Sequence, residues 1–271
     1  MSVNTQQQGS PVVEVRNLVT YYGTRKILDD ISMNVCEGEI MVIMGGSGSG
    51  KSTLLRYMLG LHRPDEGEVR LFGRDISRLG GREWQEVRRR IGVAFQGGAL
   101  FNSMTVGENV RLPLREHTRL DENTMRIMSR MKLEVVNLSG FEHLMPAQLS
   151  GGMVKRAALA RALVMDPEIL FFDEPSAGLD PVVAADLDKL ILRIRDATRV
   201  AIVVVTHELE SAFEIADRIT VLDRGRILMI GTVDEVRNSD NARVRNLLSR
   251  TSEDIEVDAE DYLQRLTEGA D

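Results

Sequence analysis

The strongest chemical signal in the sequence is a glycine-rich segment that fits the pattern G-x-x-x-x-G-K-[ST]. It reads Gly45-Gly46-Ser47-Gly48-Ser49-Gly50-Lys51-Ser52-Thr53. Its glycines let backbone N–H groups turn toward a polyphosphate, and the start of a following helix adds positive potential. Lys51 is predicted to reach the β- and γ-phosphates, and Ser52 to ligate Mg²⁺. A chance Gly-Ser turn is the alternative, but an apolar strand before the segment and an apolar helix after it favour a nucleotide site.

Two adjacent acids provide the second chemical signal. Asp173 and Glu174 end the apolar run Ile169-Leu170-Phe171-Phe172. The tip of a parallel strand brings carboxylates to the edge of the sheet where the phosphate loop also lies. Asp173 is predicted to hold the Mg²⁺ shell, and Glu174 to orient and deprotonate the attacking water. Solvated acids after a strand are equally common in isolation, so this prediction depends on the phosphate loop.

The elements that must position these residues alternate between strands and helices. Dense apolar runs predict buried strands, and two segments of the form Thr-x-x-Glu predict helix starts at Thr105 and Thr232. The predicted strands are 12–15, 40–44, 69–72, 91–95, 169–172, 200–205, 218–222 and 227–230. This alternation predicts a doubly wound α/β core. Residues 96–159 lack strand signals and are predicted to form a helical insert, in which Met125, Met128 and Met131 pack into the core.

Composition limits the class of protein. No segment approaches the roughly 18 apolar residues that would span a bilayer. The polar N-terminus argues against secretion, and the single cysteine favours a reducing compartment. The net charge is −7, of which −6 lies in residues 249–271, so these residues are interpreted as an acidic extension to a nearly neutral body. Nothing in the charge pattern indicates nucleic-acid binding.

The stretch Leu149-Ser150-Gly151-Gly152-Met153 resembles the signature motif of the ABC ATPase family. A serine and two glycines open a helix, whose backbone amides and dipole face an anion. The resemblance implies a RecA-like P-loop NTPase core with a helical ABC sub-domain at about 96–159. It assigns 11–248 to the ATPase domain and implies that Ser150, Gly151 and Gly152 contact the ATP held by a second copy. The family's usual glutamine is replaced by Met153.

Further family landmarks follow in the expected order. Gln96 matches the glutamine that senses Mg²⁺ and water, and His207 matches the switch histidine near the γ-phosphate. Asp180 ends a stretch, Ser176-Ala-Gly-Leu-Asp, that is similar to the D-loop. Tyr22 matches the aromatic residue that stacks on adenine. Each has an ordinary structural alternative, such as a core tyrosine or a strand-end histidine, but their common order favours the ATPase.

Other segments resemble the ATPases of MCE-type (Mla-type) lipid transporters. The most specific are the run Phe95-Gln-Gly-Gly-Ala-Leu-Phe and the signature that ends in methionine. Known members often have Gly-Gln-Asp in the D-loop, where this chain has Gly178-Leu179-Asp180. The resemblance implies a homodimer on the cytoplasmic face of a bacterial inner membrane. It also implies a membrane permease, a periplasmic MCE lipid-binding ring, phospholipid as cargo and, in some members, a small STAS-domain protein.

Several alternatives stay open from the sequence alone. An importer ATPase for a small polar solute is the nearest, and a P-loop kinase is the alternative from another class. Residues 97–104 are the predicted permease-contacting surface, or else an ordinary loop. The acidic extension 249–271 either docks on the partner ATPase or remains disordered, since high charge disfavours burial.

Overall fold

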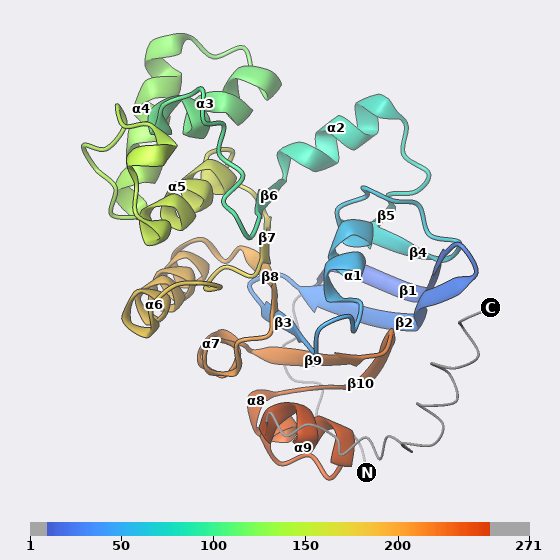
Figure 1. Cartoon of the computed structure of the whole chain (residues 1–271). Coiled ribbons are helices and arrows are strands. Elements are labelled where there is room, and N and C mark those ends of the chain that lie inside the picture. Colours follow the sequence, from blue (N-terminus) through green and yellow to red (C-terminus); the bar gives the residue numbers. More distant parts are fainter. Residues whose placement is uncertain (1–9, 250–271) are drawn as a thin grey trace, which may run out of the picture.

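The computed structural model describes residues 10–249, which form two β-sheets and a set of helices (Figure 1). The strands are β1 Pro11–Tyr22, β2 Arg25–Cys36, β3 Ile40–Met44, β4 Glu66–Leu71, β5 Arg74–Asp75, β6 Ile91–Ala94, β7 Ile169–Asp173, β8 Ala201–Thr206, β9 Arg218–Asp223 and β10 Arg226–Gly231. The helices are α1 Lys51–Met58, α2 Gly81–Arg89, α3 Val106–His117, α4 Glu122–Val135, η1 Pro146–Gln148, α5 Gly151–Leu163, α6 Pro181–Thr198, α7 Leu209–Ile215, α8 Val233–Arg237 and α9 Ala242–Ser249. The extension predicted at 249–271 lies outside the described residues apart from Ser249.

The larger sheet has six strands in the order β10-β9-β3-β8-β7-β6. All neighbouring pairs are parallel except the hairpin of β9 and β10 at one edge. Successive side chains of a strand point to opposite faces, so the inner strands must be apolar throughout to be covered on both faces. Every residue of β3 is buried, and Val42 joins one core while Met41 and Ile43 join the other. The predicted parallel core is therefore present.

The two faces of this sheet have different covers. Helices α5, α6 and α7 contribute side chains to the core on one face. On the other face, α1 packs together with a four-stranded antiparallel sheet of order β2-β1-β4-β5 (Figure 1). Val13 and Val15 of β1 point into this second core. The antiparallel sheet is a departure from a simple doubly wound arrangement, in which helices alone cover both faces.

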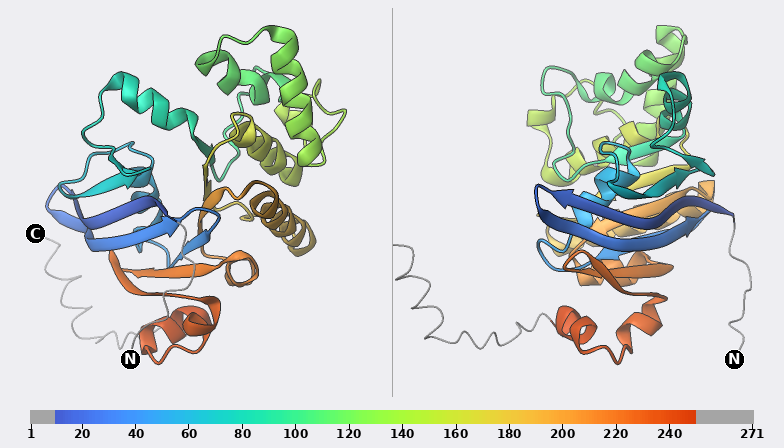
Figure 2. Two further views of the ribbon diagram at one scale, coloured as in Figure 1. Left: turned by 180° about the vertical axis from the view of Figure 1, so that it is seen from behind. Right: turned by 90° about the vertical axis from the view of Figure 1, so that its right-hand side faces the viewer.

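Helices α3, α4 and α5 pack on one another; α5 also packs against β6, whereas α3 and α4 stand away from both sheets, as Figure 2 shows. They connect β6 to β7, which is where the sequence predicted a helical insert. Each helix begins with a side-chain cap: Thr105 forms a capping box with Glu108, Asp121 caps α4, and Ser150 caps α5. Among residues 10–249, no helix is both long enough and apolar enough to cross a bilayer.

One part of the methionine prediction is wrong. Met125 is buried and Met128 packs against the core, but Met131 is 60% exposed. Residues spaced by three drift around a helix of 3.6 residues per turn, so Met131 lies about 120° away from Met125. The core face of α4 continues instead through Leu133.

Candidate functional site

A cleft of about 700 Å³ lies at the carboxyl end of the parallel strands. Residues from four separate connections line it: the loop after β3, the residue Gln96 after β6, Glu174 after β7, and the start of the segment after β8. They are Met44, Gly45, Gly46, Ser47, Gly48, Lys51, Ser52, Gln96, Glu174, His207, Glu208, Leu209 and Leu247. The fold thus brings together the glycine-rich loop, Gln96, Glu174 and His207, which are far apart in the sequence. Ligands in open parallel sheets bind at this edge.

The glycine-rich loop owes its shape to close packing under it. A Cβ at Gly45 would lie 2.0 Å from the Leu222 carbonyl oxygen, and one at Gly50 would lie 2.7 Å from Leu28 Cδ2. Gly50 also has a φ of 108° and is the N-cap of α1, a position that side chains disfavour. Only glycine fits at both sites. The loop therefore presents backbone N–H groups and the N-terminus of α1, which favour an anion.

Lys51 is the cation of this loop. It is buried, and its Nζ donates to the carbonyl oxygens of Gly45 at 2.8 Å and Gly46 at 3.0 Å. Burial lowers the pKa of Lys51, whereas Glu174 and Asp173 raise it. Within residues 10–249 the hydrogen-bond partners of this partly desolvated ammonium are neutral oxygens, which suits it to bind phosphate. Thr53, from the same motif, is half-buried in α1 and does not line the cleft.

Asp173 ends β7 with a carboxylate that is not fully partnered. Its Oδ1 is buried and has no hydrogen-bond partner among the described residues. Burial raises the pKa of Asp173, and the neighbouring Glu174 raises it further, while Arg56, Lys155 and Lys51 lower it. An unpartnered buried carboxylate oxygen is costly unless a cation or hydrogen-bond donor meets it. Ser49 has a similarly unpartnered hydroxyl oxygen in the phosphate loop.

The Glu174 carboxylate, unlike that of Asp173, has hydrogen-bond partners on both oxygens. Its backbone has a φ of 50°, an uncommon conformation for a residue with a side chain. Its Oε1 lies 2.8 Å from His207 Nδ1, and its Oε2 accepts from Thr206 Oγ1 at 3.2 Å and from His207 N at 3.4 Å. Strained residues of this kind persist where the surroundings fix them, often at functional sites. The carboxylate is thereby aimed from the end of β7 into the cleft.

Ser49, Gly50, Thr53 and Asp173 do not line the cleft but directly adjoin residues that do. Five further predicted residues lie outside the cleft of this chain. Ser150, Gly151 and Gly152 open α5, where the Ser150 hydroxyl accepts from Met153 N at 3.3 Å. Asp180 caps α6 by accepting from Val182 N and Val183 N, both at 3.1 Å. Tyr22 ends β1 and is 77% exposed. None of these five residues lines the cleft. A nucleotide bound in the cleft of one chain would therefore not be surrounded by them.

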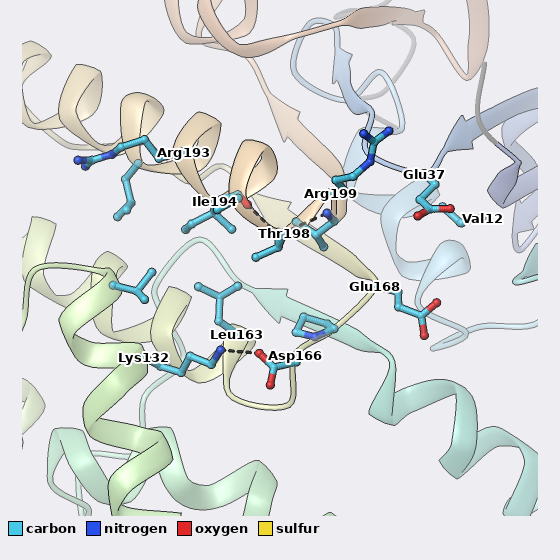
Figure 3. Close-up of a pocket in the computed structure, with 15 residues that line it drawn as sticks. Val12, Glu37, Lys132, Leu163, Asp166, Glu168, Arg193, Ile194, Thr198 and Arg199 are labelled. Atoms are coloured by element: carbon cyan, nitrogen blue, oxygen red, sulfur yellow. Dashed lines mark hydrogen bonds and ion pairs between the residues drawn. The ribbon is translucent and has the colours of Figure 1, made fainter. Parts of the chain in front are cut away.

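A second groove, of about 540 Å³, contains none of the predicted site residues (Figure 3). It lies beside the segments that lead into β7 and β8, at the opposite end of these strands from the cleft. Its walls combine apolar side chains such as Leu163 and Ile194 with charged ones, and Lys132 forms an ion pair with Asp166. The other charged side chains of the groove, which include Glu37, Glu168, Arg193 and Arg199, carry both signs, so the groove does not indicate a particular ligand.

Sequence reasoning assigned no role to Met44, Glu208, Leu209 and Leu247, which line the cleft, or to Lys155, which lies beside it. Lys155 donates from α5 to the carbonyl oxygens of Gln96 and Glu174. Leu209 and Leu247 line the cleft from α7 and α9. The lysine stands out in the Ala- and Leu-rich helix α5, but the sequence pattern does not reveal its two partners. The position of Leu247 depends on how α9 packs, which no local pattern reveals.

Comparison with known proteins agrees with this geometry. The domain family described as "ABC transporter" matches residues 28–177. "Intermembrane phospholipid transport system ATP-binding protein MlaF" of Haemophilus influenzae is 42% identical over 95% of this chain and 98% of its own length. "Probable ribonucleotide transport ATP-binding protein mkl" of Mycobacterium leprae is 41% identical over 88% of this chain and 68% of its own length. The structure of the ATP-binding cassette MJ0796, a dimer in a post-hydrolysis state bound to ADP and Pi, has a TM-score of 0.75 and 33% identity, and covers 82% of this chain and 98% of that chain.

Proposed function

This chain belongs to the ABC transporter family, and on that premise we propose that it drives the movement of phospholipid between two bacterial membranes. It is an ATPase subunit. The observation that carries the phospholipid proposal is the relative from Haemophilus influenzae, which matches this chain from end to end and is named for that transport. The mycobacterial relative, named for ribonucleotide transport, extends well beyond the matched region. It makes a small polar solute the second candidate cargo.

The proposed nucleotide contacts come from the glycine-rich loop. Gly45 to Gly50 and the N-terminus of α1 would hold the phosphates, with Lys51 on the β- and γ-phosphates. Mg²⁺ fits the donors at the cleft, because the unpartnered Asp173 Oδ1, the Ser52 hydroxyl and the Gln96 amide are all oxygen ligands. When bound, the ion neutralises charge on the phosphates.

For hydrolysis, we assign the activation of water to Glu174. Its carboxylate projects into the cleft beside His207, which can both orient it and approach the γ-phosphate. Thr206 and the His207 backbone hold the second oxygen. This arrangement supports removal of a proton from a water molecule by a base that is already oriented.

The proposed active form is a homodimer. In one chain, Ser150 and its two glycines lie outside the cleft that holds the phosphate loop, although they open a helix whose N-terminus favours anions. A second copy placed face to face would bring them to the γ-phosphate and would complete each site. The dimeric assembly of the cassette MJ0796 supports this arrangement. Asp180 and the exposed Tyr22 would act in the same assembly, at the interface and on adenine.

The remaining partners follow from the same proposal. A membrane permease would bind the segment 97–104, where the buried Asn109 side chain fixes the backbone of Phe101, a residue that is 52% exposed. The chain would lie on the cytoplasmic face of the inner membrane. A periplasmic MCE subunit, and in some complexes a STAS-domain protein, would complete the transporter. Residues 11–248 would form the ATPase domain, with 96–159 as its helical sub-domain.

The test is transport by the intact complex. A tag on this chain would purify it with its permease, and the complex would be reconstituted into vesicles that contain fluorescent phospholipid. We expect ATP-dependent transfer of the lipid to acceptor vesicles, and no transfer with the matched Glu174→Gln complex. Turnover that rises with added ribonucleotide or another polar solute, without lipid transfer, would replace the phospholipid proposal by the solute candidate.

A further inference from the structure

Lys155 makes an unusual pair of contacts from the second turn of α5. Its Nζ donates to the backbone carbonyl of Gln96 and, at 3.0 Å, to the backbone carbonyl of Glu174. These two residues follow β6 and β7, which are neighbouring parallel strands. In the part of the chain that the structure describes, both hydrogen-bond partners of this ammonium are neutral oxygens. One side chain thus connects the signature helix to both sides of the cleft.

The same helix contacts the segment after Gln96 a second time. Arg161 donates from Nη1 to the carbonyl of Ala99 at 2.7 Å and from Nη2 to that of Gly98 at 2.8 Å. Arg161 therefore attaches this segment to α5, but its donor groups do not reach Glu174. Among residues 10–249, Lys155 is the side chain that hydrogen-bonds to both carbonyls, so beyond the β6–β7 pairing the spacing of Gln96 and Glu174 depends on Lys155 and not on Arg161.

The charge of Lys155 also bears on the cleft. Burial lowers the pKa of Lys155, whereas Glu174 and Asp173 raise it. Lys155 in turn lowers the pKa of Asp173. Lys155 therefore places a positive charge beside these two acids, in addition to its two hydrogen bonds.

We propose that Lys155 is a positioning residue for ATP hydrolysis, which sets the spacing of Gln96 and Glu174 by clamping their backbone carbonyls to α5. The inference rests on the roles proposed for Gln96 and Glu174. A shift of about 1 Å in a reacting group is enough to lower a rate by about 100-fold. Loss of the clamp should therefore impair the chemical step while it leaves ATP binding by the glycine-rich loop intact.

Lysine suits this task because its compact ammonium has three rotatable donors, which can reach two carbonyls in different directions. Arginine offers a planar fork of fixed geometry, so it should restore the clamp only in part. Methionine has a side chain of similar length and volume but no donor and no charge. These differences make Lys155→Met and Lys155→Arg an informative pair.

The experiment compares the full-length variants Lys155→Met and Lys155→Arg with the wild type, and uses Lys189→Met, an exposed lysine on α6, as the matched control. Phosphate release gives kcat and KM, titration with a fluorescent ATP analogue gives Kd, and thermal melting reports folding. We expect Lys155→Met to lose about 10- to 100-fold in kcat, with KM and Kd within about twofold of the wild type. Its Mg²⁺ requirement should increase, and Lys155→Arg should recover part of kcat. Lys189→Met should match the wild type.

Other outcomes would overturn the inference. These are a kcat of Lys155→Met within twofold of the wild type, a loss confined to KM and Kd, or an equal loss in Lys189→Met. If Lys155→Met melts below the assay temperature, Lys155→Gln replaces it and should show a smaller loss of the same kind. Glu174→Gln distinguishes a failure of the proposed site roles from a failure of the Lys155 clamp alone. If it retains turnover, the proposed site roles fail. If it abolishes turnover while Lys155→Met remains active, only the clamp fails.

Discussion

Replacement of Glu174 by glutamine tests the role of this carboxylate with little disturbance of its surroundings. The amide is isosteric, so its oxygen can accept from Thr206 Oγ1 and His207 N, as Oε2 does now at 3.2 and 3.4 Å. Its NH₂ group would then face His207 Nδ1, which lies 2.8 Å from Oε1. All three contacts are kept when His207 carries its proton on Nε2, so that Nδ1 accepts from the amide NH₂, but the amide cannot take a proton from water. We therefore expect folding and ATP binding to be preserved.

The expected loss follows from general-base catalysis. A positioned base contributes about 10²- to 10⁴-fold, which corresponds to about 2.7–5.4 kcal/mol of activation free energy. The assay is phosphate release under saturating ATP and Mg²⁺, together with Kd for a fluorescent ATP analogue and the melting temperature. Kd should stay within about twofold of the wild type. An ATP-bound dimer should accumulate on size exclusion, because the step that ends this state is blocked.

Glu174→Ala is the matched comparison. It removes the acceptor for the Thr206 hydroxyl and for His207 N, which should cost about 1–3 kcal/mol in the free energy of unfolding. The alanine variant should thus lose both stability and turnover, whereas the glutamine variant should lose turnover alone. A kcat of Glu174→Gln within tenfold of the wild type would refute the role given to this residue. So would a loss of ATP affinity that accounts for the whole change in kcat/KM.

Three further changes have distinct expected results. Lys51→Ala should weaken ATP binding by about 10- to 100-fold, because a charged hydrogen-bond donor to phosphate is lost, and an unchanged Kd in nucleotide titration would contradict this. Ser150→Ala should leave the Kd of the single chain for ATP unchanged and reduce ATP-driven dimerisation on size exclusion. The lost helix cap should also cost about 1 kcal/mol in thermal melting. A loss of ATP affinity equal to that of Lys51→Ala would contradict the proposal that Ser150 acts across the dimer. Asp188→Asn should raise the melting temperature at pH 7, because burial first and Glu214 second raise the pKa of Asp188 from 3.8, against the opposing hydrogen bond from Ser211. Because the pKa of Asp188 is raised in the folded protein, the cost of ionising it is absent below about pH 3.8 and grows as the pH rises toward the folded pKa. The stability gained by Asp188→Asn, on the order of 1 kcal/mol at pH 7, should therefore disappear near pH 4. An equal gain at both pH values would show that the ionisation of Asp188 is not its cause.

The central strands were predicted closely from the sequence, because strands that are buried on both faces are nearly continuous apolar runs. The strand β3 is apolar at every position, and β7 and β8 are apolar up to their last residues, Asp173 and Thr206; burial on both faces explains such runs. The antiparallel sheet was not predicted beyond the start of β1 and part of β4. The register of β2 against β1 is interrupted by several bulges, and the charged Asp29 and Asp30 break the apolar alternation of β2. Local patterns therefore did not reveal what covers the second face of the large sheet.

Site residues were predictable where they follow a strand. The glycine-rich loop, Gln96, Glu174 and His207 all occupy such positions, and the fold brings them to one cleft. Contacts made across elements were not predictable. Lys155 reaches its two carbonyls only because α5 is oriented toward the ends of β6 and β7, and a helical pattern does not fix that orientation. The same limit applies to Leu247, which reaches the cleft from the last described helix.

The place at which α3, α4 and α5 join the sheet has a consequence for chain entropy. They connect β6 and β7, which pair directly, and Arg90 and Glu168 at the start of this pair are 78 residues apart in the chain. The entropy of closing a loop grows only with the logarithm of its length, by about 0.6 kcal/mol for each doubling. Relative to a ten-residue turn, this long connection therefore costs the sheet only about 2 kcal/mol. The sheet edge tolerates a helical segment of almost any size at this point, so the length of the segment is free to vary with whatever surface it has to meet.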